Sequence, residues 1–109
     1  IVEMVRKQGA KNVYFASAAP PVRYQNVYGI DMPATKELVA HGKTVEEIRR
    51  FIGADELIYQ DIEDLRMAAH IGNTNITSFE DSVFTGKYRA GKISEEYLSR
   101  LENNRSSKE

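Results

Sequence analysis

The sequence predicts an α/β fold built around part of a parallel sheet. Two short apolar runs, Val13 to Ala16 and Leu57 to Tyr59, have the composition of buried strands. Helical patterns stand before, between and after these runs, in the order helix, strand, two helices, strand, helix. Strands that alternate with helices favour a parallel α/β layer, and a further helix is predicted near the C-terminus.

The first predicted helix ends at Gly9 and leads into a strand over residues 12–17. Its apolar face is formed by Ile1, Val2, Met4 and Val5. No residue ahead of this face offers a side-chain cap. We therefore expect the chain to be a segment of a longer protein, which would leave a strand edge of its sheet unpaired.

A long irregular loop follows the first strand. Regular structure is excluded from it by Pro20, Pro21, Gly29 and Pro33. Compact domains seldom contain so long a connection without a use. The loop carries a cation, an amide, two phenols and a carboxylate, which are Arg23, Asn26, Tyr24, Tyr28 and Asp31. Because it begins at the carboxyl end of a strand, where open α/β sheets bind ligands, we expect a site here.

Two helices are predicted between the strands. Thr35 is expected to cap a short helix that runs through His41. Thr44 and Glu47 form a capping box for the next helix, which stops at Gly53 before the second strand. The residues that this second helix is expected to bury are Val45, Ile48, Phe51 and Ile52.

The rest of the chain is predicted to be helical with polar connections. Asp61 is expected to cap a helix that stops near Gly72. Its apolar side would consist of Ile62, Leu65, Ala68 and Ala69. Residues 79–88 form a short piece of strand-like composition, and Ser94 starts a last helix that turns Tyr97, Leu98 and Leu101 toward the core. Residues 103–109 are a polar tail that we expect to be frayed.

Composition excludes several classes of function. The chain has 109 residues, enough for one small domain, and a formal charge of −1, which gives no footprint for nucleic acid or an anionic membrane. It contains no Cys, so disulfides, thiol catalysis and thiolate metal sites are excluded. No apolar run approaches the roughly 20 residues that span a bilayer. These properties predict a soluble cytoplasmic protein.

Most of the candidate catalytic residues have a structural explanation. His41 and His70 are single histidines near predicted helix ends, where a cation complements the helix dipole. The acidic group at Asp61, Glu63 and Asp64 is explained by helix capping, and no glycine-rich phosphate loop is present. For the loop residues Tyr24, Tyr28 and Asp31, a role in a site or an interface and a role in packing both stay open.

The order of motifs resembles one enzyme family. FASAAPPVRYQNVYGIDMP, followed by ELVAHG, IGADELIYQD and SVFTGKY, is similar to the C-terminal part of the glutamine phosphoribosylpyrophosphate amidotransferases. The resemblance runs in uninterrupted order from Ile1 to about Leu101. It implies the later strands of a type I phosphoribosyltransferase domain, a Rossmann-like fold, over residues 1–72. A C-terminal extension with the final helix then follows over 73–102, and the polar tail over 103–109.

The resemblance also implies an activity. In this family, also called amidophosphoribosyltransferases, a glutaminase domain releases ammonia, and a glycosyltransferase domain adds it to phosphoribosyl pyrophosphate to begin purine biosynthesis. Tyr28, Asp31 and Pro33 match positions that line the transferase site or the ammonia route, and Leu38 belongs to the same lining. Asp31 would either orient the incoming amine or anchor the loop through backbone N–H groups, as Asp commonly does in turns.

Further implications concern ligands and partners. Tyr88 matches a position linked to feedback by purine nucleotides, and the parent enzyme is expected to be a homo-oligomer, a tetramer. Its Mg²⁺ and phosphate ligands would lie outside this chain, so the isolated segment is expected to be inactive. The lack of Cys near Asn26 and over Glu80 to Val83 places the chain in the branch without an iron–sulfur cluster. The alternative is a small independent α/β module that binds a nucleotide or a protein and has no catalytic role.

Overall fold

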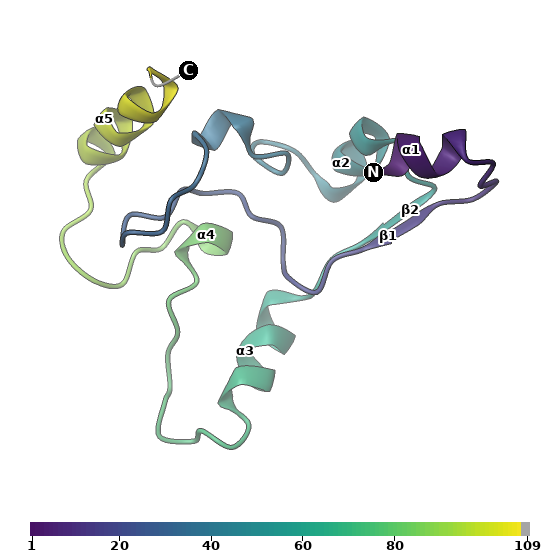
Figure 1. The fold of residues 1–109 in the computed structure, drawn as a ribbon. Helices are drawn as coiled ribbons and strands as arrows, with labels where there is room; N and C mark the ends of the chain where they lie inside the picture. The colour runs from purple at the N-terminus through teal and green to yellow at the C-terminus, as the bar shows by residue number, and fades with distance from the viewer. Residues whose placement is uncertain (108–109) are drawn as a thin grey trace.

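The computed structural model describes residues 1–107 and shows an open α/β arrangement (Figure 1). Its elements in chain order are α1 (Val2–Lys7), β1 (Tyr14–Ala16), the 3₁₀ turn η1 (Thr35–Glu37), α2 (Val45–Ile52), β2 (Glu56–Ile58), α3 (Ile62–His70), α4 (Ser82–Thr85) and α5 (Glu95–Ser106). The predicted α/β class is confirmed. The order of elements also agrees as far as α3.

The sheet consists of β1 and β2, which run parallel with Phe15 opposite Leu57. Both strands were predicted, although β2 begins and ends one residue earlier than expected. Two small apolar clusters lie on one face of the sheet. The first contains Val2, Val13 and Ala54, and the second contains Ala40, Ile48 and Leu57. Phe15 and Ile52 pack against both clusters, so α1 and α2 lie on the same face.

The start of the sheet is held by one carboxylate. The Val13 N–H donates to Asp55 Oδ2 over 2.7 Å, and Arg6 Nη2 donates to the same oxygen over 2.7 Å. Arg6 also donates to the Gly53 carbonyl oxygen. The Val13 N–H, together with the Arg6 guanidinium, lowers the pKa of Asp55 from its ordinary value. This contact joins α1, β1 and the turn before β2.

Helix α2 follows its sequence signals closely. The Thr44 side chain accepts from the Glu47 N–H, the Glu47 carboxylate accepts from the Thr44 N–H, and Gly53 ends the helix with φ of 74°. Ile48 is buried as predicted. The prediction for Phe51 is wrong, because its side chain is 70% exposed and its ring lies 5.0 Å from the Lys43 ammonium.

Three other local predictions need correction. The helix expected from Thr35 to His41 is one 3₁₀ turn, because the residue at its N-cap is Ala34, which has no side-chain oxygen, and Leu38 is already extended. The strand-like piece at 79–88 contains the short helix α4, which Gly86 ends. Helix α3 begins at its Asp61 cap as predicted, but it buries none of its side chains within residues 1–107.

The C-terminal helix is longer than predicted. Helix α5 starts after its Ser94 cap and continues to Ser106, so the expected frayed tail is wrong for residues 103–106. Residues 108 and 109 of that predicted tail lie outside the described residues. Residues 103–106 are helical because α5 contacts the loop after β1. The polarity of the sequence in this stretch does not indicate that contact.

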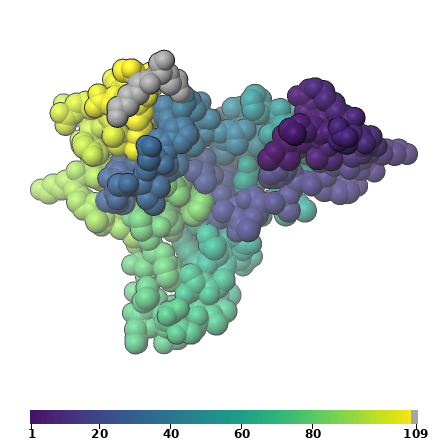
Figure 2. All heavy atoms as spheres, viewed as in Figure 1, coloured from purple at the N-terminus to yellow at the C-terminus, as the bar shows by residue number. Residues whose placement is uncertain are grey.

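The molecule is flat and branched. Its principal extents are 49, 43 and 20 Å. In Figure 1 the sheet with α1 and α2 lies at one end, α5 lies at the other, and α3 projects from between them. Figure 2 shows the same uneven outline with side chains included. No helix within residues 1–107 is long and apolar enough to cross a membrane.

Candidate functional site

The loop between β1 and η1 is held in place from three sides. The N–H groups of Arg23 and Tyr24 both donate to the Val83 carbonyl oxygen in α4, over 2.8 and 3.0 Å. The Arg23 guanidinium donates to the carbonyl oxygens of Ala40 and Lys43, in the segment before α2. The loop was predicted to be irregular, and it is. It is nevertheless fixed by hydrogen bonds to elements far along the chain.

Two buried polar side chains, Gln25 and Asn26, connect this loop to α5. Each is 5% exposed. Gln25 Nε2 donates to the Leu98 carbonyl oxygen over 3.1 Å, and Arg105 Nη1 donates to Gln25 Oε1 over 3.3 Å. Arg105 Nη2 also donates to the Asn26 carbonyl oxygen over 3.0 Å. We call Gln25, Asn26 and Arg105 the polar anchor.

Asn26 also shapes the part of the loop that leads to Asp31. Its Oδ1 accepts from the Tyr28 N–H over 2.8 Å and from the Ile30 N–H over 3.2 Å. Two backbone donors on one buried side-chain oxygen close this turn, as Asn commonly does. The loop-anchoring role that the sequence allowed for Asp31 is therefore performed by Asn26.

A second contact of α5 holds η1. The Glu102 carboxylate accepts from the Thr35 N–H over 2.8 Å and from the Lys36 N–H over 3.2 Å. Glu102 thus caps η1, because Ala34 at the N-cap of this turn has no side-chain oxygen that could accept these hydrogen bonds. Burial opposes ionisation of Glu102, but these two N–H donors outweigh it and lower the pKa of the carboxyl below its ordinary value.

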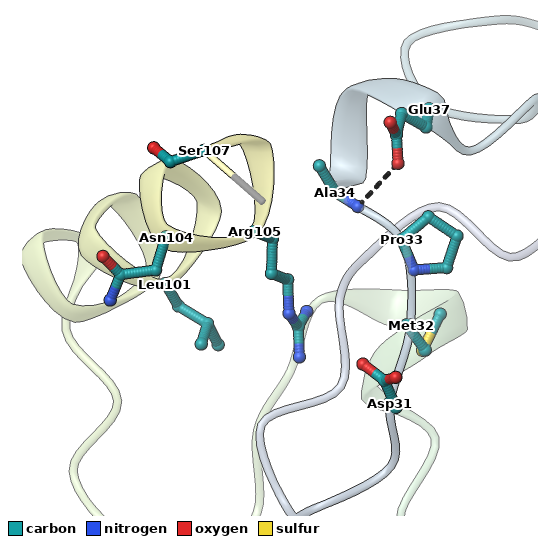
Figure 3. Close-up of a pocket in the computed structure, with 9 residues that line it drawn as sticks. All are labelled: Asp31, Met32, Pro33, Ala34, Glu37, Leu101, Asn104, Arg105 and Ser107. Carbon is teal, nitrogen blue, oxygen red and sulfur yellow. Dashed lines mark hydrogen bonds between the residues drawn. The ribbon is translucent and has the colours of Figure 1, made fainter. Parts of the chain in front are cut away.

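Between α5 and the loop lies an open cavity of about 740 Å³. It is lined by Asp31, Met32, Pro33, Ala34, Glu37, Leu101, Asn104, Arg105 and Ser107. Figure 3 shows Leu101 and Arg105 extending from α5 toward the strip of loop that carries Asp31, Met32 and Pro33. The Glu37 carboxylate is already engaged, because it accepts from the Ala34 N–H over 3.0 Å.

The Asp31 carboxylate is the free acidic group of this cavity. Asp31 is exposed, and within residues 1–107 its carboxylate accepts no hydrogen bond. Met32, Pro33 and Leu101 supply apolar surface beside it. A carboxylate that accepts hydrogen bonds, set against apolar walls, suits a small ligand that carries N–H or O–H groups.

Tyr28 and Tyr88 come together outside this cavity. Their ring centroids lie 6.4 Å apart with an interplanar angle of 68°, an edge-to-face arrangement. The Tyr88 hydroxyl donates to the Gln25 carbonyl oxygen over 2.8 Å, and the Tyr28 hydroxyl donates to the Ala90 carbonyl oxygen over 2.8 Å. Burial, together with the neighbouring Tyr28, raises the pKa of Tyr88. Both rings therefore brace the loop against the segment after α4.

The five residues predicted for the site do not form one cluster. Asp31 and Pro33 line the cavity, while Tyr28 and Tyr88 form the aromatic pair. Leu38, which ends η1, is half buried and does not line the cavity. The loop geometry thus divides the predicted set into a cavity pair, an aromatic pair and one separate leucine.

Several residues of α5 and the buried amide Gln25 were missed by sequence reasoning, whereas Asn26 was named as one of the polar residues of the loop. Arg105, Asn104 and Ser107 were assigned to a tail. A signal for them existed, because residues 95–109 contain no Gly or Pro and Leu98, Leu101 and Arg105 share one helix face. The burial of Gln25 and Asn26 had no such signal, since a polar residue in a loop is usually exposed.

The histidines and acidic residues do not form a second centre. His70 lies at the end of α3, and its Nδ1 is 2.8 Å from the Ile76 carbonyl oxygen. His41 Nδ1 is 3.1 Å from the Arg23 carbonyl oxygen. His41 does not end a helix, contrary to prediction, while His70 does. Over residues 1–107, no group of three or more His, Cys, Asp or Glu side chains is placed to hold a metal ion.

Comparison with known proteins gives a consistent set of relatives. No family model matches the chain. The amidophosphoribosyltransferase of Pseudomonas aeruginosa is 52% identical over 105 residues, which cover 96% of this chain and 21% of the relative. The Escherichia coli protein of the same name is 54% identical over 102 residues, or 94% of this chain and 20% of the relative. The Saccharomyces cerevisiae protein is 47% identical over 107 residues, or 98% of this chain and 20% of the relative.

The match falls in the C-terminal part of these relatives. The chain spans about a fifth of the length of the curated relatives that it matches. The similarity includes the loop and most of α5, since it extends over more than nine tenths of the chain.

Proposed function

Because the chain belongs to the amidophosphoribosyltransferase family, we propose that it is the ammonia-accepting side of a type I phosphoribosyltransferase domain. The enzyme it serves would join glutamine-derived ammonia to phosphoribosyl pyrophosphate, giving phosphoribosylamine at the start of purine synthesis. The proposed partners are therefore phosphoribosyl pyrophosphate and glutamine, and the proposed location is the cytoplasm.

The observation that carries this proposal is the free carboxylate of Asp31 in the cavity beside α5. The loop that presents Asp31 is held by Asn26 and the polar anchor, so the carboxylate has a defined position without being used as a structural acceptor. Ammonia has N–H donors and a lone pair. A carboxylate that accepts one N–H directs the lone pair away from itself, toward the carbon to be attacked.

The reaction assigned to the site is a displacement at the anomeric carbon. The nitrogen lone pair of ammonia forms the new C–N bond, pyrophosphate leaves with the electrons of the C–O bond, and the ammonium formed loses one proton to solvent. Apolar walls help before this step, because a low-dielectric passage disfavours protonated ammonia. Pro33 and Met32 supply such a wall in the cavity, and we assign Leu38 to the approach to it.

Other parts of the reaction are assigned to residues outside this segment. The described residues bring together no cluster of acidic side chains suited to Mg²⁺, and the sequence has no glycine-rich phosphate loop. We therefore propose that Mg²⁺ and the phosphates are bound by the rest of the domain and that the isolated chain is inactive. With no Cys thiolates, the chain would hold no iron–sulfur cluster.

Regulation is proposed at the aromatic pair. Tyr88 is half buried and its ring meets Tyr28 edge to face, so a purine ring stacked there would also contact the start of the Asp31 turn. A purine nucleotide bound beside Tyr88 would thus affect the same loop that carries the carboxylate. We propose this as the feedback site of a homotetrameric enzyme.

The experiment is a full-length chimera in which this chain replaces the matching segment of the Pseudomonas aeruginosa relative. Phosphoribosylamine formation is measured with glutamine and, separately, with ammonium salt. We expect Asp31→Asn to lower the ammonium-dependent rate by about tenfold to a hundredfold, because the incoming nitrogen loses its orientation. The matched control is Asp64→Asn, on the exposed side of α3.

An unchanged rate for Asp31→Asn would contradict the assigned role. An inactive chimera, together with tight binding of purine mononucleotides by the isolated chain, would favour the independent binding module instead.

A further inference from the structure

A second open cavity, of about 500 Å³, lies between the loop after β1 and the segment that leads into α2. It shares no residue with the cavity beside α5. We call it the basic cavity, because three of its lining residues are basic and none is acidic, although the chain has a formal net charge of −1. The lining residues are Arg23, Tyr24, His41, Gly42, Lys43 and Thr44.

The bases of this cavity have no acidic partner. Within residues 1–107, no ion pair includes Arg23, His41 or Lys43. The acidic residues that follow Lys43 along the chain, Glu46 and Glu47, are engaged in contacts of α2 itself. Positive charge that is not balanced by nearby carboxylates attracts a dissolved anion. The basic cavity therefore has the electrostatics of an anion site.

The Arg23 side chain is oriented by backbone groups instead of a carboxylate. Its Nη1 donates to the carbonyl oxygens of Ala40 and Lys43. In the part of the chain that the structure describes, its Nε and Nη2 donate to no acceptor. A guanidinium presents its N–H donors in a planar fork that matches two oxygens of a phosphate. Arg23 is thus held in place with donors still available for a ligand.

The other two bases are also held without losing their charge. His41 Nδ1 is 3.1 Å from the Arg23 carbonyl oxygen, which can only accept, so Nδ1 carries a hydrogen. Protonation at Nε2 then gives a second N–H donor and a positive charge. Lys43 Nζ lies 5.0 Å from the Phe51 ring centroid, a contact that restricts the ammonium and leaves its charge intact.

The cavity beside α3 shows what an occupied set of bases looks like. This cavity, of about 470 Å³, is lined by Arg66 and Arg89 among others. Glu63 lines it as well, and Arg66 is paired with both Glu63 and Asp81. The Arg66 charge is therefore balanced by carboxylates of the chain itself, and the basic cavity differs in offering bases that are not.

We propose that the basic cavity binds a phosphate dianion, which is either free phosphate or the phosphate group of a sugar or nucleoside monophosphate. Arg23 supplies paired donors, and His41 and Lys43 supply further donors and charge. A dianion with several oxygens matches three separate bases better than a monovalent carboxylate does. The volume of the cavity lies in the range of small-molecule sites. This site lies outside the Asp31 cavity and does not rest on the proposed function.

Competitive labelling in the chimera tests the site. Acetylation of Lys43 by N-hydroxysuccinimidyl acetate is followed by peptide mass spectrometry, with and without inorganic phosphate at constant ionic strength. Phosphate should slow acetylation of Lys43 at least about threefold, because the bound anion covers the amine. Lys11, exposed before β1, is the matched control and should react at the same rate in both conditions. Equal slowing of Lys11 and Lys43 would overturn the proposal.

A histidine variant tests whether the bases act together. His41→Asn should raise the phosphate concentration that halves Lys43 acetylation at least about fivefold, because one charged donor is lost. His70→Asn, at the end of α3, is the control and should leave that concentration unchanged. An unchanged concentration in His41→Asn would contradict the assigned site.

Arsenate bound in crystals of the chimera gives a measurement that needs no variant. Arsenate has the shape and charge of phosphate, and its arsenic atom is located by anomalous scattering. The expected peak lies between Arg23, His41 and Lys43. Anomalous peaks at other places only would overturn the proposal.

Two monoesters distinguish the source of the phosphate group. Ribose 5-phosphate and adenosine 5′-monophosphate are each compared with inorganic phosphate in the Lys43 assay. A halving concentration at least about tenfold lower for one monoester would identify that class as the ligand. Protection by inorganic phosphate alone would identify free phosphate, and protection by none of the three would overturn the proposal.

These measurements do not depend on turnover. A chimera in which phosphate protects Lys43 but which forms no phosphoribosylamine would contradict the proposed function and leave the anion site standing. An active chimera without protection of Lys43 would do the reverse.

Discussion

Two regions of the molecule are held together by different kinds of interaction. The sheet region comprises residues 1–58 without the long loop. The α5 region comprises the loop over residues 23–37 together with α5. In the sheet region, apolar side chains such as Ile48 and Leu57 meet in two small clusters. In the α5 region, buried amides and charged side chains meet through hydrogen bonds. Apolar packing tolerates small shifts, but a buried polar pairing does not. The region that carries Asp31 therefore depends on exact partners.

The largest expected effect is in the sheet region. Ile48 is 1% exposed, and Ile48→Ala should lower the free energy of unfolding by about 3 kcal/mol, since it removes buried methylenes and leaves a cavity. Urea denaturation of the chimera followed by circular dichroism measures it. Val45→Ala, at a site 38% exposed on the same helix, is the control and should cost less than about 1 kcal/mol. Equal losses of unfolding free energy in the two variants would mean that the cluster around Ile48 is open to solvent.

A smaller effect is expected at the polar anchor. Asn26→Ala should cost about 1 to 2 kcal/mol, because two partly buried backbone donors lose their acceptor. Amide exchange at Tyr28 and Ile30 should speed up, while the Ile48 amide should change little. The control is Asn75→Ala, in the exposed loop after α3. If the Tyr28 and Ile30 amides kept their protection in Asn26→Ala, the loop would be held by something other than this side chain.

The smallest effect is a local response to acid. The pKa of Glu102 is lowered in the folded chain, so its contribution to stability is present above the ordinary glutamate pKa and is lost as pH falls through the lowered value. The Thr35 and Lys36 amides should then lose protection over acidic pH, as measured by hydrogen exchange corrected for intrinsic rates. Glu102→Gln should remove this pH dependence, and Glu96→Gln, at the exposed start of α5, should keep it. If the pH dependence of amide exchange persisted in Glu102→Gln, another titratable group would be responsible for it.

Local signals predicted the sheet region and the start of α3 well. The Thr44 and Glu47 box, the Gly53 stop and the Asp61 cap all depend on residues a few positions apart, and all three are present. Where a cap was only apparent, prediction was wrong: Ala34, not Thr35, precedes η1, and the turn relies on Glu102 from α5.

The candidate site was predicted in part. The loop was identified from its prolines and polar residues, and Asp31 and Pro33 do line a cavity. The opposite wall was not, because Arg105 falls in the polar stretch 103–109 that was predicted to be a frayed tail, although it shares a helix face with Leu98 and Leu101. Tyr28 and Tyr88 were both named, but nothing in their spacing indicated that their rings would meet.

By itself, the sequence determined the α/β class, the two strands, the caps of α2 and α3 and the irregular loop, since each of these depends on neighbours within one or two turns of chain. Only the tertiary structure decided that Arg105 reaches Asn26, 79 positions away, and that Tyr14 and Ile58 face outward. Contacts between distant residues depend on how the elements pack and on the cost of closing the chain between them. No pattern of neighbouring residues predicts the balance between packing and chain closure.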